Sequence, residues 1–257
     1  MERIRHAFTN GKAFIGFLTG GDPNLSDSEE RILALARGGA DIIEIGVPFS
    51  DPIAEGPVIQ AANIRALSAG VTVPDIFNLS GKLRRQIQTP LVLLTYLNPV
   101  FHYGYGRFFE KCVETGVDGV VIPDMPFEEQ GEAKSIAREN GVALISLVAP
   151  TSEERIERIA KDADGFLYIV SSMGVTGVRG EITSDLKSMI ASVRAVSDIP
   201  AAVGFGVGTP GQAREITAEA DGVIIGSAIV RLAAQHGENA PAAIEAYARG
   251  IKAAIGG

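Results

Sequence analysis

Two carboxylates near the end of one predicted strand could carry out acid–base chemistry. Glu44 lies within the apolar segment from Asp41 to Ile45, and Glu55 lies in the loop that follows it. Successive side chains of a strand point to opposite faces, so Glu44 shares the face of Ile42 and should be buried. Burial without a partner raises the pKa of a carboxyl, which would suit proton transfer near neutral pH. An ion-paired structural glutamate is the alternative at this point.

Two glycine-rich turns could bind a phosphate group. Gly204, Gly206 and Gly208 follow one predicted strand, whereas Gly226 and Ser227 follow another and open a helix. Glycine lets backbone approach a ligand closely, and the first amides of a helix favour an anion. Turn glycines needed only for backbone geometry are the alternative interpretation.

A third glycine-rich segment runs from Ser171 to Gly180. Its length and its small residues are typical of a lid that orders over a bound ligand. We expect this lid to lie on the same side of the fold as the two carboxylates.

Eight short apolar runs alternate with helical patterns and would place these groups in space. The runs are Ala13 to Leu18, Asp41 to Ile45, Leu91 to Tyr96, Gly119 to Ile122, Val142 to Leu147, Phe166 to Val170, Ala201 to Val203 and Gly222 to Ile225. Eight strand–helix units in 257 residues predict an α/β fold, a closed (β/α)₈ TIM barrel. A doubly wound open sheet is the runner-up, although it would need fewer strands.

Helical patterns between these runs include Ser26 to Arg37, Glu128 to Glu139 and Ser152 to Lys161, where Ser152 could cap the helix. In a TIM barrel the chemistry lies at the C-terminal ends of the strands. The unusual residues of this chain cluster in the loops that follow strands, which agrees with that rule.

Composition excludes several classes of protein. A net charge of −8 argues against a nucleic-acid partner, and no apolar run is long enough for a membrane span. The single Cys112 has an apolar helical setting typical of a core residue. His6, His102 and His236 have no metal-like spacing, so we expect no metal site. Residues 1–257 are predicted to form one cytoplasmic domain that binds a small substrate.

Segments spread over almost the whole chain resemble the tryptophan synthase α subunit family. They are Phe17 to Pro23, Glu44 to Pro52, Gly56 to Gln60, Tyr96 to Pro99, Pro123-Asp124, Gly174 to Gly177, Gly204 to Gly206 and Gly226 to Val230. The run from Glu44 to Pro52 is particularly specific to that family.

The resemblance implies a lyase of tryptophan biosynthesis that splits indole-3-glycerol phosphate into indole and glyceraldehyde 3-phosphate. It also implies an α₂β₂ heterotetramer with a tryptophan synthase β subunit that carries pyridoxal phosphate, and no cofactor in this chain. Glu44 would transfer the protons, and Glu55 would stay ionised on a more solvated loop and accept the indole N–H.

The resemblance assigns the remaining site residues by position. Tyr168 and Phe205 would line the substrate pocket, and Thr176 would meet Glu55 when the lid closes. Phe17 and Leu94 fit the apolar indole end, although a pure core role is as compatible with the sequence. Backbone N–H groups would hold the phosphate at Gly177, Gly206, Gly226 and Ser227. Asp124 is expected to order a loop.

Glu55 departs from the family, which usually has aspartate at this position. The extra methylene puts the placement of the carboxylate in question, because a misplacement of about 1 Å can cost on the order of a hundredfold in rate. Two alternatives therefore stay open. One is a catalytically weakened allosteric partner of the β subunit. The other is a different phosphate-binding barrel of the same pathway, which would favour lysine or paired aspartates at strand ends.

Overall fold

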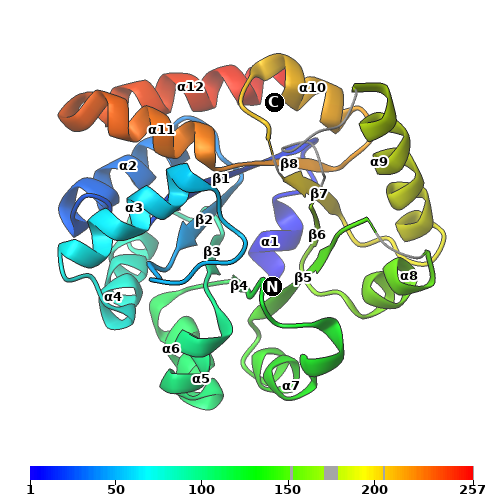
Figure 1. Ribbon diagram of the computed structural model, residues 1–257, viewed down its shortest axis with the longest axis horizontal. Coiled ribbons are helices and arrows are strands. Elements are labelled where there is room, and N and C mark those ends of the chain that lie inside the picture. Colours follow the sequence, from blue (N-terminus) through cyan, green and yellow to red (C-terminus); the bar gives the residue numbers. More distant parts are fainter. Residues whose placement is uncertain (151–152, 171–178, 205, 257) are drawn as a thin grey trace.

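The protein folds as a closed barrel of eight parallel strands in strict chain order, surrounded by helices (Figure 1). The computed structural model describes residues 1–150, 153–170, 179–204 and 206–256. The strands are β1 Ala13–Thr19, β2 Ile42–Gly46, β3 Leu91–Leu94, β4 Gly119–Val121, β5 Ala143–Val148, β6 Leu167–Val170, β7 Ala201–Gly204 and β8 Gly222–Ile225. Strand β1 pairs with both β2 and β8, which closes the barrel.

Apart from the first helix, which precedes β1, the helices cover the outside of the barrel. They are α1 Glu2–His6, α2 Leu25–Arg37, α3 Pro57–Ser68, α4 Val73–Arg84, α5 Leu97–Tyr103, α6 Tyr105–Thr115, α7 Gly131–Glu139, α8 Glu153–Asp162, α9 Arg179–Arg194, α10 Pro210–Thr217, α11 Ser227–His236 and α12 Ala240–Ala254. Two short 3₁₀ turns, Phe127–Glu129 and Gly237–Asn239, precede α7 and α12. No helix in the described residues is long and apolar enough to cross a membrane.

Several helices begin at residues that satisfy their free amides. The Asn24 side chain accepts a hydrogen bond from the Asp27 amide at the start of α2. Thr72 and Thr209 form capping boxes at the starts of α4 and α10, each with a proline in the first turn. These caps fix the residues at which the helices begin. They therefore also fix where the preceding loops end.

Strand register decides which side chains face the barrel interior. Phe17 of β1 pairs with Glu44 of β2, and Glu44 pairs with Val92 of β3, so these three side chains point inward together. Below them, Ile15 and Ile42 belong to an interior cluster that is almost completely buried. The interior is therefore a packed core, and the carboxylate of Glu44 lies near the C-terminal ends of the strands.

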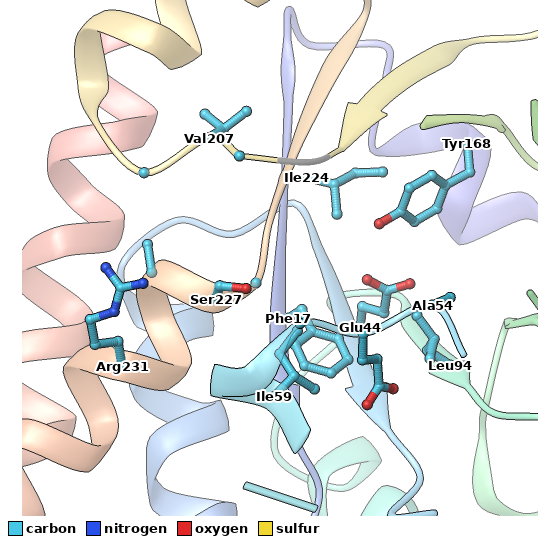
Figure 2. A pocket seen from close by; sticks show the side chains of 16 residues that line it. Phe17, Glu44, Ala54, Ile59, Leu94, Tyr168, Val207, Ile224, Ser227 and Arg231 are labelled. Atoms are coloured by element: carbon cyan, nitrogen blue, oxygen red, sulfur yellow. The ribbon is translucent and has the colours of Figure 1, made fainter. Parts of the chain in front are cut away.

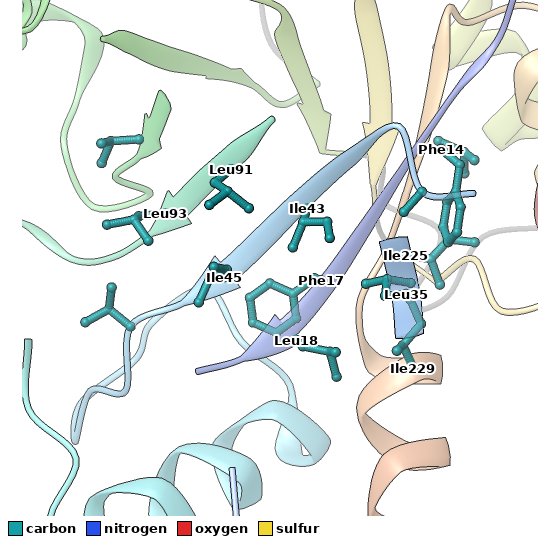
Figure 3. Close-up of a cluster of buried hydrophobic side chains, with 14 of the residues drawn as sticks. Phe14, Phe17, Leu18, Leu35, Ile43, Ile45, Leu91, Leu93, Ile225 and Ile229 are labelled. Atoms are coloured by element: carbon teal, nitrogen blue, oxygen red, sulfur yellow. The ribbon is translucent and has the colours of Figure 1, made fainter. Parts of the chain in front are cut away.

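The alternate side chains of the strands point outward and pack against the helices. Figure 3 shows Phe14, Ile43 and Ile45 in this outer layer, together with Leu35 from α2 and Ile229 from α11. Both faces of each strand are therefore covered, which explains the nearly continuous hydrophobicity of the apolar runs. Cys112 of α6 is fully buried in the same layer, as predicted.

The N-terminal residues form an unanticipated helix, α1, which lies across the barrel axis in Figure 1. Ile4 is fully buried in the interior cluster. Arg3 and Arg84 both form ion pairs with the buried Asp118, at 2.8 Å each, and Asp118 also accepts a hydrogen bond from the Leu91 amide. Helix α1 thus closes one end of the barrel and leaves the other end for the site.

The predicted barrel is confirmed, and the predicted strand bounds differ from the observed ones by at most two residues. The largest difference is at β3, which ends at Leu94 and not at Tyr96. The helix expected from Glu128 was wrong at its start, because a 3₁₀ turn precedes α7 and the α-helix begins at Gly131. Ser152, the expected cap, lies outside the described residues.

Candidate active site

A cavity of about 360 Å³ opens at the C-terminal end of the barrel (Figure 2). Its walls come from β1, β2, β3, β6 and β8 and from the loops after β2, β7 and β8. Glu44, Leu94 and Tyr168 lie on one side of it, and Ser227 and Arg231 lie on the opposite side. The cavity therefore has an acidic and apolar end and a glycine-rich end.

Glu44 is the buried carboxylate of the cavity, and only 2% of its surface is exposed. No hydrogen-bond partner reaches its Oε1 atom among the described residues. Burial, and next the negative charge of Glu55, raise the pKa of Glu44 from 4.5 to about 8. The ion-paired structural alternative is not what the structure shows, since no described cation pairs with this side chain.

Glu55 lies in the loop between β2 and α3 and is half-buried. Its Oε2 atom accepts a hydrogen bond of 2.5 Å from Nδ2 of Asn63, and the Tyr96 hydroxyl also hydrogen-bonds to the carboxylate. Burial raises the pKa of Glu55, and these two hydrogen bonds oppose the increase. Glu55 is more exposed than Glu44, as expected, although α3 and Tyr96 cover one side of the loop.

Tyr96, two residues after the end of β3, connects this loop to the barrel. Its hydroxyl accepts a hydrogen bond from the Ala54 amide at 3.2 Å, and its ring stacks on Phe49 with centroids 5.1 Å apart. Burial raises the pKa of the Tyr96 hydroxyl, so it stays a proton donor at neutral pH. The sequence marks Tyr96 only as part of a family motif, and its contact with Glu55 was not anticipated.

Asn63 was missed altogether by the sequence interpretation. A signal for it exists, because Asn63 falls between Ala62 and Ala66 on the buried side of α3. A polar residue on a buried helix face requires a hydrogen-bond partner. That partner is the second carboxylate of the site.

Apolar side chains surround Glu44. Phe17, Leu94 and Tyr168 all line the cavity, and Ile59 and Ile224 complete this wall. Phe17 is also only 3% exposed, so it serves both the core and the cavity wall. Burial, and next the charge of Glu44, raise the pKa of the Tyr168 hydroxyl well above its ordinary value.

Glycines keep the opposite end of the cavity open. Gly206, Gly226 and Ser227 line it, and Gly206 has a φ of 75°, a conformation that favours glycine. A Cβ atom at Gly226 would lie 3.3 Å from Phe17. Gly226 is also the N-cap of α11, so the free first amides of that helix begin at this cavity wall.

Arg231, one turn into α11, was not predicted. It is the one cationic side chain among the described residues that line the cavity. The sequence offered a signal, since residues four apart share a helix face and Ser227 was already assigned to the site.

Three predicted site residues, Thr176, Gly177 and Phe205, lie outside the described residues. The lid was predicted from Ser171 to Gly180. Its residues 171–178 also lie outside the described residues, whereas Arg179 and Gly180 belong to the first turn of α9. Asp124, by contrast, has the expected loop-ordering contact, since its Oδ1 atom accepts a hydrogen bond from the Leu97 amide at 2.8 Å.

The chain matches the family model described as "Tryptophan synthase alpha chain" over residues 5–255. It is 48% identical to the tryptophan synthase alpha chain of Lacticaseibacillus casei over 255 residues, covering 99% of this chain and 96% of the relative. Its identity to the corresponding chain of Lactiplantibacillus plantarum is 46% over 258 residues, covering 100% and 97% of the two chains.

Solved structures agree with these sequence matches. Tryptophan synthase subunit alpha from Legionella pneumophila superposes with a TM-score of 0.90 at 35% identity, covering 99% of this chain and 98% of that chain. A chain of the tryptophan synthase complex from Pyrococcus furiosus superposes with a TM-score of 0.85 at 34% identity, covering 95% and 99%. The chain therefore belongs to the tryptophan synthase alpha chain family.

Proposed function

We propose that this chain cleaves indole-3-glycerol phosphate to indole and glyceraldehyde 3-phosphate within one domain that spans residues 1–257. The observation that carries the proposal is the buried carboxyl of Glu44, which faces the cavity of about 360 Å³. Its pKa is raised to about 8. Cleavage of this carbon–carbon bond needs a proton at indole C3, loss of a proton from the glycerol hydroxyl, and stabilisation of charge at the indole nitrogen.

Glu44 is assigned both proton transfers. At pH 7 a carboxyl with a pKa near 8 is mostly protonated, so it can act first as the acid that protonates C3. The carboxylate that results can then remove the proton from the glycerol hydroxyl. Phe17, Leu94 and Tyr168 exclude water from this end of the cavity and hold the indole ring there.

Glu55 is assigned the role of accepting a hydrogen bond from the indole N–H. Positive charge develops on that nitrogen as C3 is protonated, and a fixed carboxylate stabilises it. The hydrogen bonds from Asn63 and Tyr96 favour the charged form of Glu55 and fix its position. Two carboxylates in unlike environments thus take unlike roles.

The phosphate is assigned to the glycine-rich end of the cavity. Gly206, Gly226 and Ser227 line this end, and the free amides at the start of α11 favour an anion. The guanidinium of Arg231 adds a positive charge there. Gly177 would contribute from the segment after β6.

A β subunit is the partner, in an α₂β₂ heterotetramer, and pyridoxal phosphate would be bound by that subunit and not by this chain. One solved relative, from Pyrococcus furiosus, is part of a tryptophan synthase a2b2 complex. At the C-terminal end of this barrel, Ile53 and Phe101 are 76% and 70% exposed, which suits a face covered by another chain. A cytoplasmic location is part of the same proposal.

Indole release from indole-3-glycerol phosphate, assayed with and without β subunit, tests the function. We expect slow cleavage by the chain alone and an acceleration of about tenfold or more with partner, because partner contacts offset part of the entropy of ordering loops at this face. Complex formation without indole release would instead support the weakened allosteric partner.

A further inference from the structure

We infer that Asn63 is a positioning residue that holds Glu55 in the orientation needed to accept the indole N–H. The inference rests on the proposed function and names a residue that the assigned reaction does not use directly. It concerns the contact between the second turn of α3 and the loop that carries Glu55.

The local fold makes Asn63 a fixed donor. Helix α3 begins directly after the loop, with Gly56 as N-cap and Pro57 in the first turn. Ala62 and Ala66 are fully buried on either side of Asn63, and Asn63 itself is only 2% exposed. Its amide group therefore cannot turn to solvent, and it approaches the carboxylate with Nδ2 at 2.5 Å from Oε2 of Glu55.

The carbonyl oxygen of the Asn63 side chain makes no hydrogen bond with the described residues that would stabilise the fold. This Oδ1 atom is buried. A buried acceptor without a partner is a cost to folding, which natural proteins keep where function requires it. The side chain is thus explained by its contact with Glu55 and not by helix packing.

Charge makes this contact consequential. Glu55 loses solvation in the loop, and the hydrogen bond from Asn63 is the largest opposing influence on its pKa. The other titratable groups near it are Glu44, which is mostly protonated and uncharged below about pH 8, and Tyr96, which donates a second hydrogen bond. Without Asn63, the carboxylate of Glu55 would keep only the hydrogen bond from Tyr96 and would protonate at higher pH.

Gln60 provides a matched control on the same helix. Its Nε2 atom donates to the backbone carbonyl of Glu55 at 2.8 Å, and its side chain is exposed. Gln60→Ala removes a hydrogen bond to the same residue without touching the carboxylate. If α3 had a purely structural role, substitutions of Gln60 and of Asn63 would have similar effects on kcat.

The test compares Asn63→Leu with Gln60→Ala in complex with β subunit, by kcat and KM for indole release between pH 5 and pH 9. Leucine keeps the shape of asparagine and removes its donor. We expect Asn63→Leu to lower kcat by about tenfold or more, consistent with loss of a charge-assisted hydrogen bond. Its KM should stay within about threefold, and the acidic limb of its profile should move to higher pH. Gln60→Ala should resemble the wild type.

An unchanged pH profile and a kcat within about twofold of wild type in a folded Asn63→Leu protein would overturn the inference. Circular dichroism and thermal unfolding establish folding, and Asn63→Ser replaces Asn63→Leu if that variant does not fold. Failure of the proposed function looks different, because the wild type itself would then release no indole.

Discussion

At the scale of single residues, the two glutamates differ because their surroundings differ. Glu44 has no described hydrogen-bond donor at Oε1 and a pKa near 8, whereas Glu55 accepts hydrogen bonds that favour its charged form. The burial of Glu44 could be predicted from strand alternation alone. The environment of Glu55 could not, because it depends on Asn63 and Tyr96, which approach the loop from different elements.

Glu44→Gln should stabilise the protein in a pH-dependent way. Between pH 4.5 and pH 8, Glu44 keeps its proton in the folded protein but releases it in the unfolded chain. The free energy of unfolding therefore decreases as pH rises through this range. Glutamine cannot ionise, and the free energy of unfolding should increase by about 1–3 kcal/mol at pH 7. Urea unfolding at pH 5, 7 and 8 measures this. An increase of equal size at pH 5 and pH 8 would contradict the raised pKa.

Glu55→Ala should reduce kcat by about two orders of magnitude, because it removes the charge that stabilises the indole nitrogen. Glu55→Asp should stay active, since it keeps the charge that the family usually supplies with aspartate. Steady-state indole formation by both variants is the measurement. A nearly silent Glu55→Ala would make Glu55 a loop charge and favour the partner-only alternative.

At the scale of elements, the strands of the barrel were easier to predict than the short helix that closes one of its ends. Apolar runs bounded by glycine gave the strands of the barrel closely, because both of their faces are covered. Helix α1 was not predicted, because five residues give too little periodicity and its burial depends on the barrel it closes. Arg231 was missed, although its spacing of four residues from Ser227 places both side chains on the same side of α11.

Bulky substitutions in the glycine-rich turns should weaken phosphate binding selectively. Valine at position 226 would meet Phe17, and valine at position 206 would be strained at a φ of 75°. We expect Gly226→Val and Gly206→Val to raise KM for indole-3-glycerol phosphate far more than KM for unphosphorylated indole-glycerol. Parallel kinetics with both substrates measure this. Equal losses would indicate misfolding and not a lost anion site.

At the scale of the whole molecule, the barrel separates stability from chemistry. Helix α1 and the Asp118 ion pairs close one end, and the cavity, Glu44 and the exposed Ile53 and Phe101 lie at the other. The sequence predicted the end that carries the chemistry from the ordinal positions of the loops, but not the end that α1 closes. Ile53 belongs to the same loop as Ala54, Glu55 and Gly56, which line the cavity. Under the proposed function, a β subunit that covers Ile53 would therefore influence cleavage without a separate allosteric site.

The central claim is that Glu44 transfers the protons of cleavage, and steady-state indole formation by Glu44→Gln with saturating β subunit tests it most directly. Glutamine preserves the shape of the protonated side chain and has no proton to transfer. We predict a loss of at least about 10²- to 10⁴-fold in kcat, typical of a general acid–base residue, with substrate binding largely intact. A folded variant that retains more than about a tenth of wild-type turnover would contradict this role of Glu44.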